Sequence, residues 1–472
     1  MKRVLDIFCE ICSIPHGSGN MEKISAYCMD FAEKNGLEAF LDDAKNVIIK
    51  KKGTIGLENA APVILQGHMD MVCQKDEGVS IDFEKDGIVP VIEGDLMRAK
   101  GTTLGGDNGI AVAMILAILE RDDLSHPPIE AVFTVDEEIG LIGAGKLEFS
   151  RLSGRRLINI DSEEEDTLTV SCAGGCDLIL HLPIQREKTV GKKITVKLSG
   201  LKGGHSGIEI GNGRVNADVL MGRVLAKLSE KIEISLLSVS GGDKGNAIPL
   251  SASFEGVVTD ADAFVKNCSA YLSEVKKELS QREPDFDYEV KAYSEGEFEA
   301  VGAKDSKRFF DALCTVPNGV IEMSPSIPNL VETSLNLGIL KSEENAVVFQ
   351  LMLRSNLYSA LLGLEERVKA FARLIGATTT SFGHYPPWEY RPDSPLRDLY
   401  GKIYREEIGK DIRIEAIHAG LECGVISAGL PGIDCISIGP DLWDVHTTKE
   451  RMSISSVNRV YQRIIKTLAK LG

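Results

Sequence analysis

Val63-Ile-Leu-Gln-Gly-His68-Met-Asp70-Met71 is the stretch of sequence that points to the fold. An apolar run ends in glycine, and His68 and Asp70 follow two residues apart. If the run is a strand, its period of two places both side chains on one face at the C-terminal end. Open α/β sheets bind their ligands at that end, and a nearby carboxylate orients a metal-ligating imidazole. A simple loop hydrogen bond between the two residues is the alternative.

The same pattern, an apolar strand followed by acidic residues, recurs twice along the chain. The strand expected over 129–135 leads to Glu137 and Glu138, and the strand expected over 157–160 leads to Asp161. Two adjacent glutamates after a buried strand are unfavourable unless they share a cation or a proton. A solvated loop is the plainer interpretation of the pair. Three strands therefore predict acidic or imidazole groups at one edge of a sheet.

Two further candidates lie outside these strands. Asp107 belongs to the glycine-rich loop 101–109, which precedes an apolar helix expected over 111–119. The loop lacks the Lys-Ser/Thr pair of a phosphate-binding loop, so Asp107 is either a metal ligand or a helix N-cap. His446 lies just before the last helix, expected over 454–471. The combined set mixes imidazole and carboxylate, which suits zinc: His68, Asp70, Asp107, Glu137, Glu138, Asp161 and His446.

The composition limits the partners and the location of the protein. With 472 residues the chain is too long for one hydrophobic core, so two or three domains are expected. A net charge of −17 argues against nucleic acid and anionic membranes as partners. The longest apolar run, 110–119, is about half a membrane span, and no signal peptide is expected. Ten scattered cysteines, mostly in apolar contexts, predict reduced thiols and a cytoplasmic protein.

The pattern of the chain changes in its middle third. Alternating segments such as 193–198 indicate a sheet with one solvated face, and amphipathic helices are expected among them. We therefore predict an α+β insertion over 186–384. The flanking segments, 1–185 and 385–472, are expected to form one α/β catalytic domain around a central mixed sheet.

In their order along the chain, the motifs resemble those of the dinuclear zinc metallopeptidases of the aminoacylase/carboxypeptidase type. Within that family they are most similar to the bacterial aminoacyl-histidine dipeptidases. The resemblance covers nearly the whole chain. Each motif alone is weak, but the ordered set is specific: Gln66-Gly-His-Met-Asp-Met71, Leu104-Gly-Gly-Asp-Asn-Gly109, Asp136-Glu-Glu-Ile-Gly140, Asn159-Ile-Asp-Ser162, Gly203-Gly-His-Ser-Gly207, His418-Ala-Gly-Leu-Glu422 and Val445-His-Thr447.

The resemblance implies a zinc-exopeptidase-like α/β fold and two Zn²⁺ ions per subunit, for which Co²⁺ or Mn²⁺ would substitute. One ion would be held by His68 and Asp161, and the other by Glu138 and His446. Asp107 would bridge the two ions, which share a water in sites of this kind.

Further residues receive roles from the resemblance. Asp70 would orient the neighbouring imidazole. Glu137 would take a proton from the bridging water and pass it to the leaving amine, and His205 would stabilise the oxyanion. Three residues would bind the substrate: Asn246, Arg354 and the backbone of Gly420. Plainer interpretations stay open, because His205 and Asn246 suit turns and Arg354 suits an ordinary strand.

The activity implied by the resemblance is hydrolysis of dipeptides of the Xaa-His type, including β-Ala-His, by a hydrolase whose insertion closes as a lid over a small peptide. A homodimer is the expected assembly. Two alternatives remain. The same metal core would also serve an N-acyl amino acid deacylase or a tripeptide aminopeptidase. A non-catalytic small-molecule binder is the other alternative, and Glu137 argues against it because a binder needs no base.

Overall fold

The computed structural model describes residues 1–471, which form two compact units, each with its own hydrophobic core. No helix within residues 1–471 is both long and apolar enough to span a membrane. The predicted domain limits stay predictions. By contacts within the described chain, unit 1 comprises Met1–Cys172, Trp388–Ala416 and residues 421–471, and unit 2 comprises Ala173–Pro387 and Ile417–Gly420.

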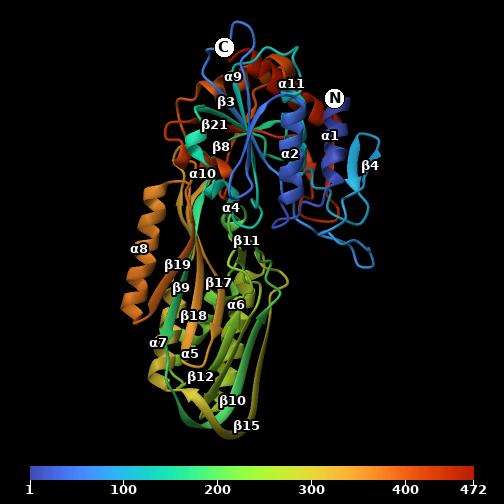
Figure 1. Cartoon of the computed structure of the whole chain (residues 1–472). Coiled ribbons are helices and arrows are strands. Elements are labelled where there is room, and N and C mark those ends of the chain that lie inside the picture. The colour runs from blue at the N-terminus through green and yellow to red at the C-terminus, as the bar shows by residue number, and fades with distance from the viewer. Residues whose placement is uncertain (472) are drawn as a thin grey trace. The chain divides into compact units, whose positions relative to one another are not determined.

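Unit 1 is built on an eight-stranded mixed sheet, and this confirms the expected fold class (Figure 1). β3 lies between β6 and β7 and runs parallel to both, so that their carboxyl ends share one edge of the sheet. Across the sheet the strands are β1 (Glu38–Leu41), β2 (Val47–Lys51), β6 (Ile129–Thr134), β3 (Val63–His68), β7 (Arg156–Asn159), β21 (Asp434–Ser437), β8 (Thr167–Cys172) and β20 (Arg413–Ile417).

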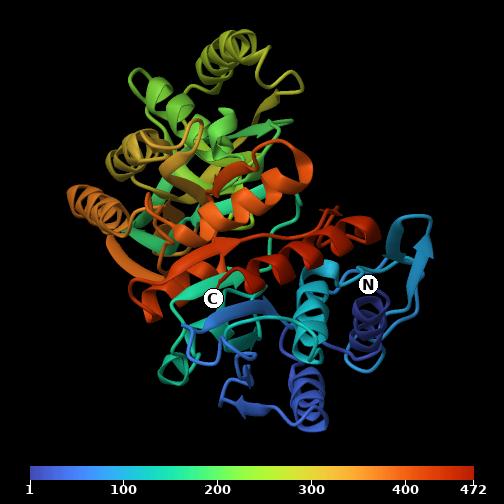
Figure 2. The ribbon, with the colours of Figure 1, turned by 90° about the horizontal axis from the view of Figure 1, so that it is seen from above.

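One hydrophobic core joins this sheet to five helices: α1 (Lys2–Cys12), α2 (Glu22–Lys34), α3 (Gly106–Leu119), α9 (Pro395–Ile408) and α11 (Ile454–Ala469). Every residue of α3 except Asp107 is buried, as expected for a helix that is apolar on all sides. Figure 2 shows α1, at the N-terminus, beside α3. Ser394 caps α9 by accepting a hydrogen bond from the Arg397 amide at 3.1 Å, and Pro395 occupies the first helical position.

The remaining elements of unit 1 are short. A turn at Gly94 joins two strands of a four-stranded sheet. That sheet contains β22 (Leu442–Trp443), β23 (Arg451–Ser453), β5 (Leu96–Ala99) and β4 (Pro90–Glu93). The short helices are α4 (Ile142–Gly145), η1 (Phe149–Arg151) and α10 (Glu422–Gly429).

Unit 2 is the α+β insertion that the alternating segments predict. Its main sheet has nine strands, and the strand pairs described for it are antiparallel. The order is β15 (Asp287–Val301), β10 (Arg186–Ser199), β14 (Ala252–Val258), β12 (Ser235–Gly241), β17 (Val331–Ser342), β18 (Ala346–Ser355), β9 (Gly174–Pro183) and β19 (Thr378–Tyr385), with β16 (Gly319–Met323) paired to β17.

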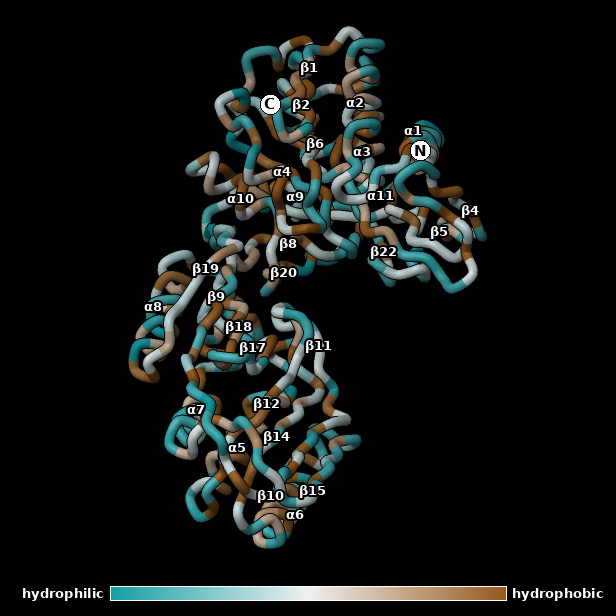
Figure 3. The backbone as a smooth tube through the Cα atoms, turned by 60° about the horizontal axis from the view of Figure 1, so that its bottom comes forward, coloured by the Kyte–Doolittle hydropathy of each residue, from teal (hydrophilic) through white to brown (hydrophobic). Residues whose placement is uncertain are grey.

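Four amphipathic helices share a hydrophobic core with this sheet: α5 (Ala217–Ser229), α6 (Ala261–Leu279), α7 (Ala303–Thr315) and α8 (Tyr358–Ile375). Figure 3 shows hydrophobic and hydrophilic colours alternating along α8. Its buried residues include Leu361, Leu364, Val368 and Ala372, which recur at helical spacing. A two-stranded sheet, β11 (Gly204–His205) with β13 (Ala247–Ile248), and η2 (Ile210–Asn212) complete the unit.

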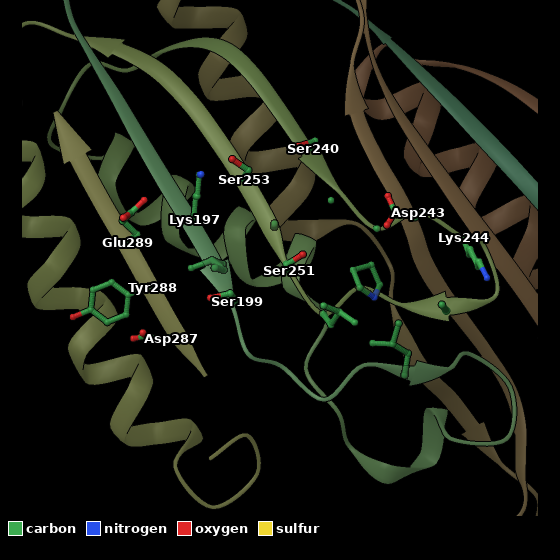
Figure 4. Close-up of a pocket in the computed structure, with 18 residues that line it drawn as sticks. Lys197, Ser199, Ser240, Asp243, Lys244, Ser251, Ser253, Asp287, Tyr288 and Glu289 are labelled. Carbon is green, nitrogen blue, oxygen red and sulfur yellow. The ribbon is translucent and has the colours of Figure 1, made fainter. Parts of the chain in front are cut away.

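The other face of the sheet in unit 2 carries a hollow lined by polar side chains (Figure 4). Lys197 of β10 lies opposite Glu289 of β15 and Ser253 of β14, and Ser253 lies opposite Ser240 of β12. These four residues form a mixed-charge row across the strands, typical of a solvated sheet face. The hollow contains none of the residues predicted to be catalytic or to bind substrate.

Candidate metal centre

The topology of unit 1 brings the candidate ligands to one edge of the sheet. β3 ends at His68, β6 leads into the pair Glu137–Glu138, and β7 leads to Asp161. Asp107 comes from the first turn of α3, where its backbone is not yet helical and the peptide bond to the next residue is cis. His446 comes from the loop after β22, with φ of 61°. A non-glycine residue in this left-handed region is typical of functional sites.

Asp107 turns one carboxylate oxygen to each of two imidazoles. Its Oδ1 lies 3.2 Å from Nε2 of His68, and its Oδ2 lies 3.0 Å from Nε2 of His446. Asp161 Oδ1 lies 3.4 Å from the His68 nitrogen, and Glu138 Oε1 lies 2.8 Å from the His446 nitrogen. The donors thus form two sets that share Asp107, and within each set the ligand atoms lie within 4.8 Å of one another.

This donor arrangement fits two divalent cations. In a tetrahedral zinc site with ligand distances of about 2.0–2.1 Å, neighbouring nitrogen and oxygen donors are roughly 3.4 Å apart. The separations of 3.2 and 3.4 Å from His68 match that value closely. Three carboxylates and two imidazoles provide enough ligands for two cations when one carboxylate is shared.

The clustered groups perturb one another strongly. Hydrogen bonds to Asp107 and Glu138 raise the pKa of His446 to about 11. Burial raises the pKa of Asp161 to about 6, although the charge of His68 opposes that shift. Burial also raises the pKa of Glu137 well above its usual range. Such shifts in a cluster of buried acids are typical of a functional site, and bound cations would relieve the repulsion between the carboxylates.

Asp70 contacts more of the site than its spacing from His68 indicates. Nδ1 of His68 lies 3.0 Å from the backbone carbonyl oxygen of Asp70 and 3.4 Å from its carboxylate. The carboxylate accepts hydrogen bonds from the amides of Glu137 at 3.0 Å and Glu138 at 3.3 Å, and from the Ser18 hydroxyl at 2.8 Å. Asp70 therefore orients both the imidazole and the two glutamates.

Sequence reasoning missed Glu450, which is almost completely buried. Its Oε2 accepts hydrogen bonds from the amides of Leu104 at 2.7 Å and Gly105 at 3.1 Å. Its Oε1 accepts from the amides of Gly106 at 2.8 Å and Asp107 at 3.3 Å. One carboxylate thereby joins the loop before α3 to the segment that carries the second imidazole. The only signal in the sequence is an acidic residue shortly after a candidate ligand.

A second buried network supports β3 from its neighbours. Glu422, left without a role by the sequence, accepts hydrogen bonds from the side chains of Gln66 at 2.5 Å and Thr134 at 2.7 Å. Asn159 donates to Gln66 at 2.6 Å, which links β7, β3 and β6. Burial raises the pKa of Glu422 to about 7. The network joins the three strands through Gln66, although the buried Oε1 of Glu422 and Oδ1 of Asn159 have no hydrogen-bond partner among the described residues.

The residues predicted to act on the substrate lie in unit 2. The ring of His205 accepts hydrogen bonds at Nδ1 from the amides of Gly207 at 3.1 Å and Ile208 at 3.2 Å. Burial and the positive charge of Arg354 lower the pKa of His205. Because Nδ1 accepts hydrogen bonds from both amides, the neutral tautomer carries its proton on Nε2. Arg354 is 5% exposed, donates from Nη1 to the Tyr385 hydroxyl at 2.8 Å, and has a buried Nε without a hydrogen-bond partner.

The other two predicted residues of unit 2 are more accessible. Asn246 is exposed, and its carbonyl accepts a hydrogen bond from the Ser206 amide at 2.8 Å, next to His205. Gly420 is half-buried and lies two residues after His418. The His418 carbonyl approaches Gly207 so closely that a Cβ at Gly207 would lie 2.3 Å from it. The segment around Gly420 therefore packs against the loop that carries His205.

Comparisons with known proteins agree with this geometry. Residues 64–470 match the family described as Peptidase family M20/M25/M40. The cytosol non-specific dipeptidase of Escherichia coli (strain K12) is 37% identical over 471 residues, 99% of this chain and 97% of that protein. The crystal structure of aminoacylhistidine dipeptidase from Vibrio alginolyticus has a TM-score of 0.90 at 37% identity, covering 99% of this chain and 96% of that one.

A more distant relative shares the fold alone. The crystal structure of aminopeptidase PepT from Bacillus cereus ATCC 10987 has a TM-score of 0.57 at 15% identity, covering 100% of this chain and 98% of that one. The family match includes all seven candidate residues of the metal centre, from His68 to His446. The family that the ordered motifs resemble is confirmed. This chain belongs to peptidase family M20/M25/M40 and is a hydrolase, a metallopeptidase of that family.

Proposed function

We propose that this metallopeptidase is a dinuclear zinc dipeptidase that hydrolyses Xaa-His dipeptides, including β-Ala-His, and other dipeptides. The observation that carries the proposal is the carboxylate of Asp107, whose two oxygens each face the Nε2 atom of a different histidine. The two relatives that are 37% identical over nearly the full chain are both named as dipeptidases, which supports the choice of substrate.

In this proposal His68 and Asp161 hold one Zn²⁺, Glu138 and His446 hold the other, and Asp107 is shared. Co²⁺ or Mn²⁺ would substitute, because they accept the same nitrogen and oxygen ligands. When bound, the cations polarise the scissile carbonyl and make water a stronger acid. The protein's part is to hold the five ligands in place through the backbone and side-chain contacts described above.

Glu137 is the proposed general base. Its carboxylate belongs to a group with His68 and Glu138 whose ligand atoms lie within 4.8 Å of one another, and Asp70 holds its amide. Glu137 takes a proton from the attacking water and then gives it to the leaving amine, so that the protein ends the cycle unchanged. A positioned acid–base group of this kind contributes about 10²–10⁴-fold to the rate.

Residues of unit 2 are proposed to bind the peptide. His205 presents Nε2–H as a donor, because Nδ1 already accepts two amides. A donor of this kind stabilises a tetrahedral oxyanion by about 3 kcal/mol. Arg354 offers a planar guanidinium to the C-terminal carboxylate of the substrate, and Asn246 and Gly420 complete the substrate contacts. We expect His205→Ala to lower kcat and Arg354→Lys to raise KM, as measured by steady-state kinetics on β-Ala-His.

The proposed setting is the cytoplasm, with a small peptide as the substrate and a homodimer as the assembly. All ten cysteines are free, as in a reducing compartment, and the relative from Escherichia coli is named for the cytosol. Light scattering coupled to size-exclusion chromatography measures the assembly, and a monomeric mass for the active, metal-loaded protein would contradict the homodimer.

A substrate panel tests the proposal. The zinc-loaded protein is given β-Ala-His, other Xaa-His dipeptides, unrelated dipeptides, tripeptides and N-acetyl amino acids, and kcat/KM is measured for each. We expect the dipeptides to be hydrolysed fastest. Higher kcat/KM on tripeptides or on N-acetyl amino acids would support the alternative peptidase or deacylase. A metal-loaded protein that binds dipeptides without hydrolysing them would be a binder, and the proposal would fail.

A further inference from the structure

A fourth group of metal-binding side chains lies wholly within unit 2 and shares no residue with the proposed centre. It consists of Cys176 on β9, Glu365 on α8 and His384 on β19, whose ligand atoms lie within 4.8 Å of one another. Figure 1 shows α8 beside β19 and β9, the three elements that supply these side chains. We propose that they form an additional divalent-cation site of the thiolate–imidazole–carboxylate type.

A β-bulge places His384 on the required face of the sheet. Phe382 of β19 pairs with Asp177 of β9, but the next pair is Tyr385 with Gly175, so β19 contains one extra residue at this point. Gly383, in the bulge, adopts a φ of 63°. A bulge reverses which side chains face each side of the sheet and is often found where a side chain must be re-aimed. His384 thereby faces Glu365 of α8.

The spacing of the donors suits a shared cation better than a direct hydrogen bond. Nε2 of His384 lies 3.4 Å from Oε2 of Glu365, which is long for a hydrogen bond between nitrogen and oxygen. Two ligands of one tetrahedral zinc ion are roughly 3.4 Å apart. The proposed centre of unit 1 shows the same separation, 3.4 Å, between the nitrogen of His68 and the oxygen of Asp161.

Glu365 already has the supporting contact that a ligating carboxylate needs. Nζ of Lys369, one turn further along α8, lies 2.9 Å from Oε1, so Oε2 stays directed to His384. Ser381 of β19 also interacts with this carboxylate. Ligating carboxylates usually accept hydrogen bonds from a second layer of residues, which fixes their orientation. The ammonium also balances part of the negative charge of a carboxylate and a thiolate.

Burial differs across the site in a way that leaves one side open. Cys176 is fully buried, and the side chain of Glu365 is 8% exposed, whereas that of His384 is 46% exposed. A cation can therefore enter from solvent on the histidine side and keep a water as its fourth ligand. Thiolate, imidazole and carboxylate together favour Zn²⁺ among common divalent cations. Binding converts the thiol to a thiolate and releases one proton.

A site here would join three elements of unit 2. β9 and β19 are neighbouring strands, and α8 packs on both. Within residues 1–471, Cys176 is the one cysteine grouped with a histidine and an acid at metal-binding distances. Cys268 of α6 is buried in the same core, and within residues 1–471 it belongs to no group of metal-binding side chains. It serves as a matched control.

Cobalt spectroscopy tests the site. The protein is stripped of metal with a chelator, dialysed and titrated with Co²⁺, and the near-ultraviolet thiolate-to-cobalt charge-transfer band is followed. We expect a band that, once all proposed positions are filled, has the intensity of one thiolate-bound Co²⁺ per chain. No ligand proposed for the centre of unit 1 is a cysteine, so the band does not arise from that centre, and the variants below assign it to Cys176. A missing band would overturn this site without touching the dipeptidase proposal.

Variants make the test specific. Cys176→Ser and His384→Ala should each abolish the charge-transfer band and remove one zinc per chain from the zinc-loaded protein. Cys268→Ser should keep the band and the zinc content of the wild type. Because His384 is half exposed, His384→Ala decides the matter if Cys176→Ser fails to fold. A band that survives in either Cys176→Ser or His384→Ala, or that is lost in Cys268→Ser, would show that cobalt binds elsewhere and would overturn the proposal.

Discussion

Glu450 offers a prediction that can be worked from distances. Its two oxygens each accept two backbone hydrogen bonds from the segment Leu104–Asp107. Glu450→Gln keeps the shape of the side chain but replaces one accepting oxygen with an amide donor. Two of the four amides would then face a donor instead of an acceptor. The loop that positions Asp107 should therefore loosen.

The magnitude follows from the lost contacts. A hydrogen bond to a charged acceptor contributes about 1.5–3 kcal/mol, so two lost bonds would cost about 3–6 kcal/mol. Because each pair of amides shares one carboxylate oxygen, we take the lower end of this range, a loss of about 3 kcal/mol. If that loss falls on the metal-binding conformation, the affinity for the cations that share Asp107 falls by about 100-fold, since 1.4 kcal/mol is tenfold.

The assay combines urea denaturation with metal titration, and Glu130 supplies a matched control. Glu130 is also buried and accepts hydrogen bonds from the amides of Ser153 at 3.0 Å and Gly154 at 2.9 Å, but it lies near the start of β6. We expect Glu130→Gln to lose stability and keep its metal affinity, whereas Glu450→Gln loses both. Wild-type metal affinity in Glu450→Gln would refute the reasoning.

Three further outcomes are expected. Asp70→Asn should lower activity about 10–100-fold in steady-state assays, because the carboxylate holds the amide of Glu137; full activity would exclude that role. Gly67→Ala should lower the free energy of unfolding by about 1–3 kcal/mol, because its methyl group would lie 2.6 Å from Asn108 Oδ1 and 2.8 Å from Ala111 Cβ; an unchanged urea midpoint would contradict this. Removing the metals with a chelator should lower the melting temperature, and adding them back should restore it. A ligand at a concentration a thousand times its Kd stabilises the folded protein by about 4 kcal/mol. An unchanged melting temperature in calorimetry would count against metal binding by the folded protein.

Much of the candidate metal centre could be predicted because simple rules govern strand ends. A period of two and an apolar run identify β3, β6 and β7, and parallel strands share their carboxyl edge. His68 ends β3, and Glu138 and Asp161 lie shortly after the ends of β6 and β7. Asp107 and His446 were predicted from loops next to helices, and the ordered motifs connected them to the strands. The α+β character of the insertion was readable from the change to alternating polarity.

Other contacts could not be predicted because they leave no pattern in the sequence. Glu450 accepts hydrogen bonds from backbone amides of a distant loop, and Leu104 in that loop is 346 residues away in the chain. Every residue except proline has a backbone amide, so this contact requires no particular residue type in the loop. Glu422 contacts Gln66 across 356 residues. The bulge at Gly383, which directs His384 to α8, depends on a pairing register that one extra residue shifts. Such features become visible only when the tertiary structure is known.

The most direct test of the central claim is a measurement of zinc content and dipeptide hydrolysis on one preparation of Glu137→Gln. The substitution keeps the size of the side chain and removes its ability to accept a proton from water. We predict the zinc content of the wild type and a kcat on β-Ala-His lower by at least about 10²–10⁴-fold. A variant that keeps the wild-type rate, or one that loses its zinc together with its activity, would contradict Glu137 as the base beside the metal pair.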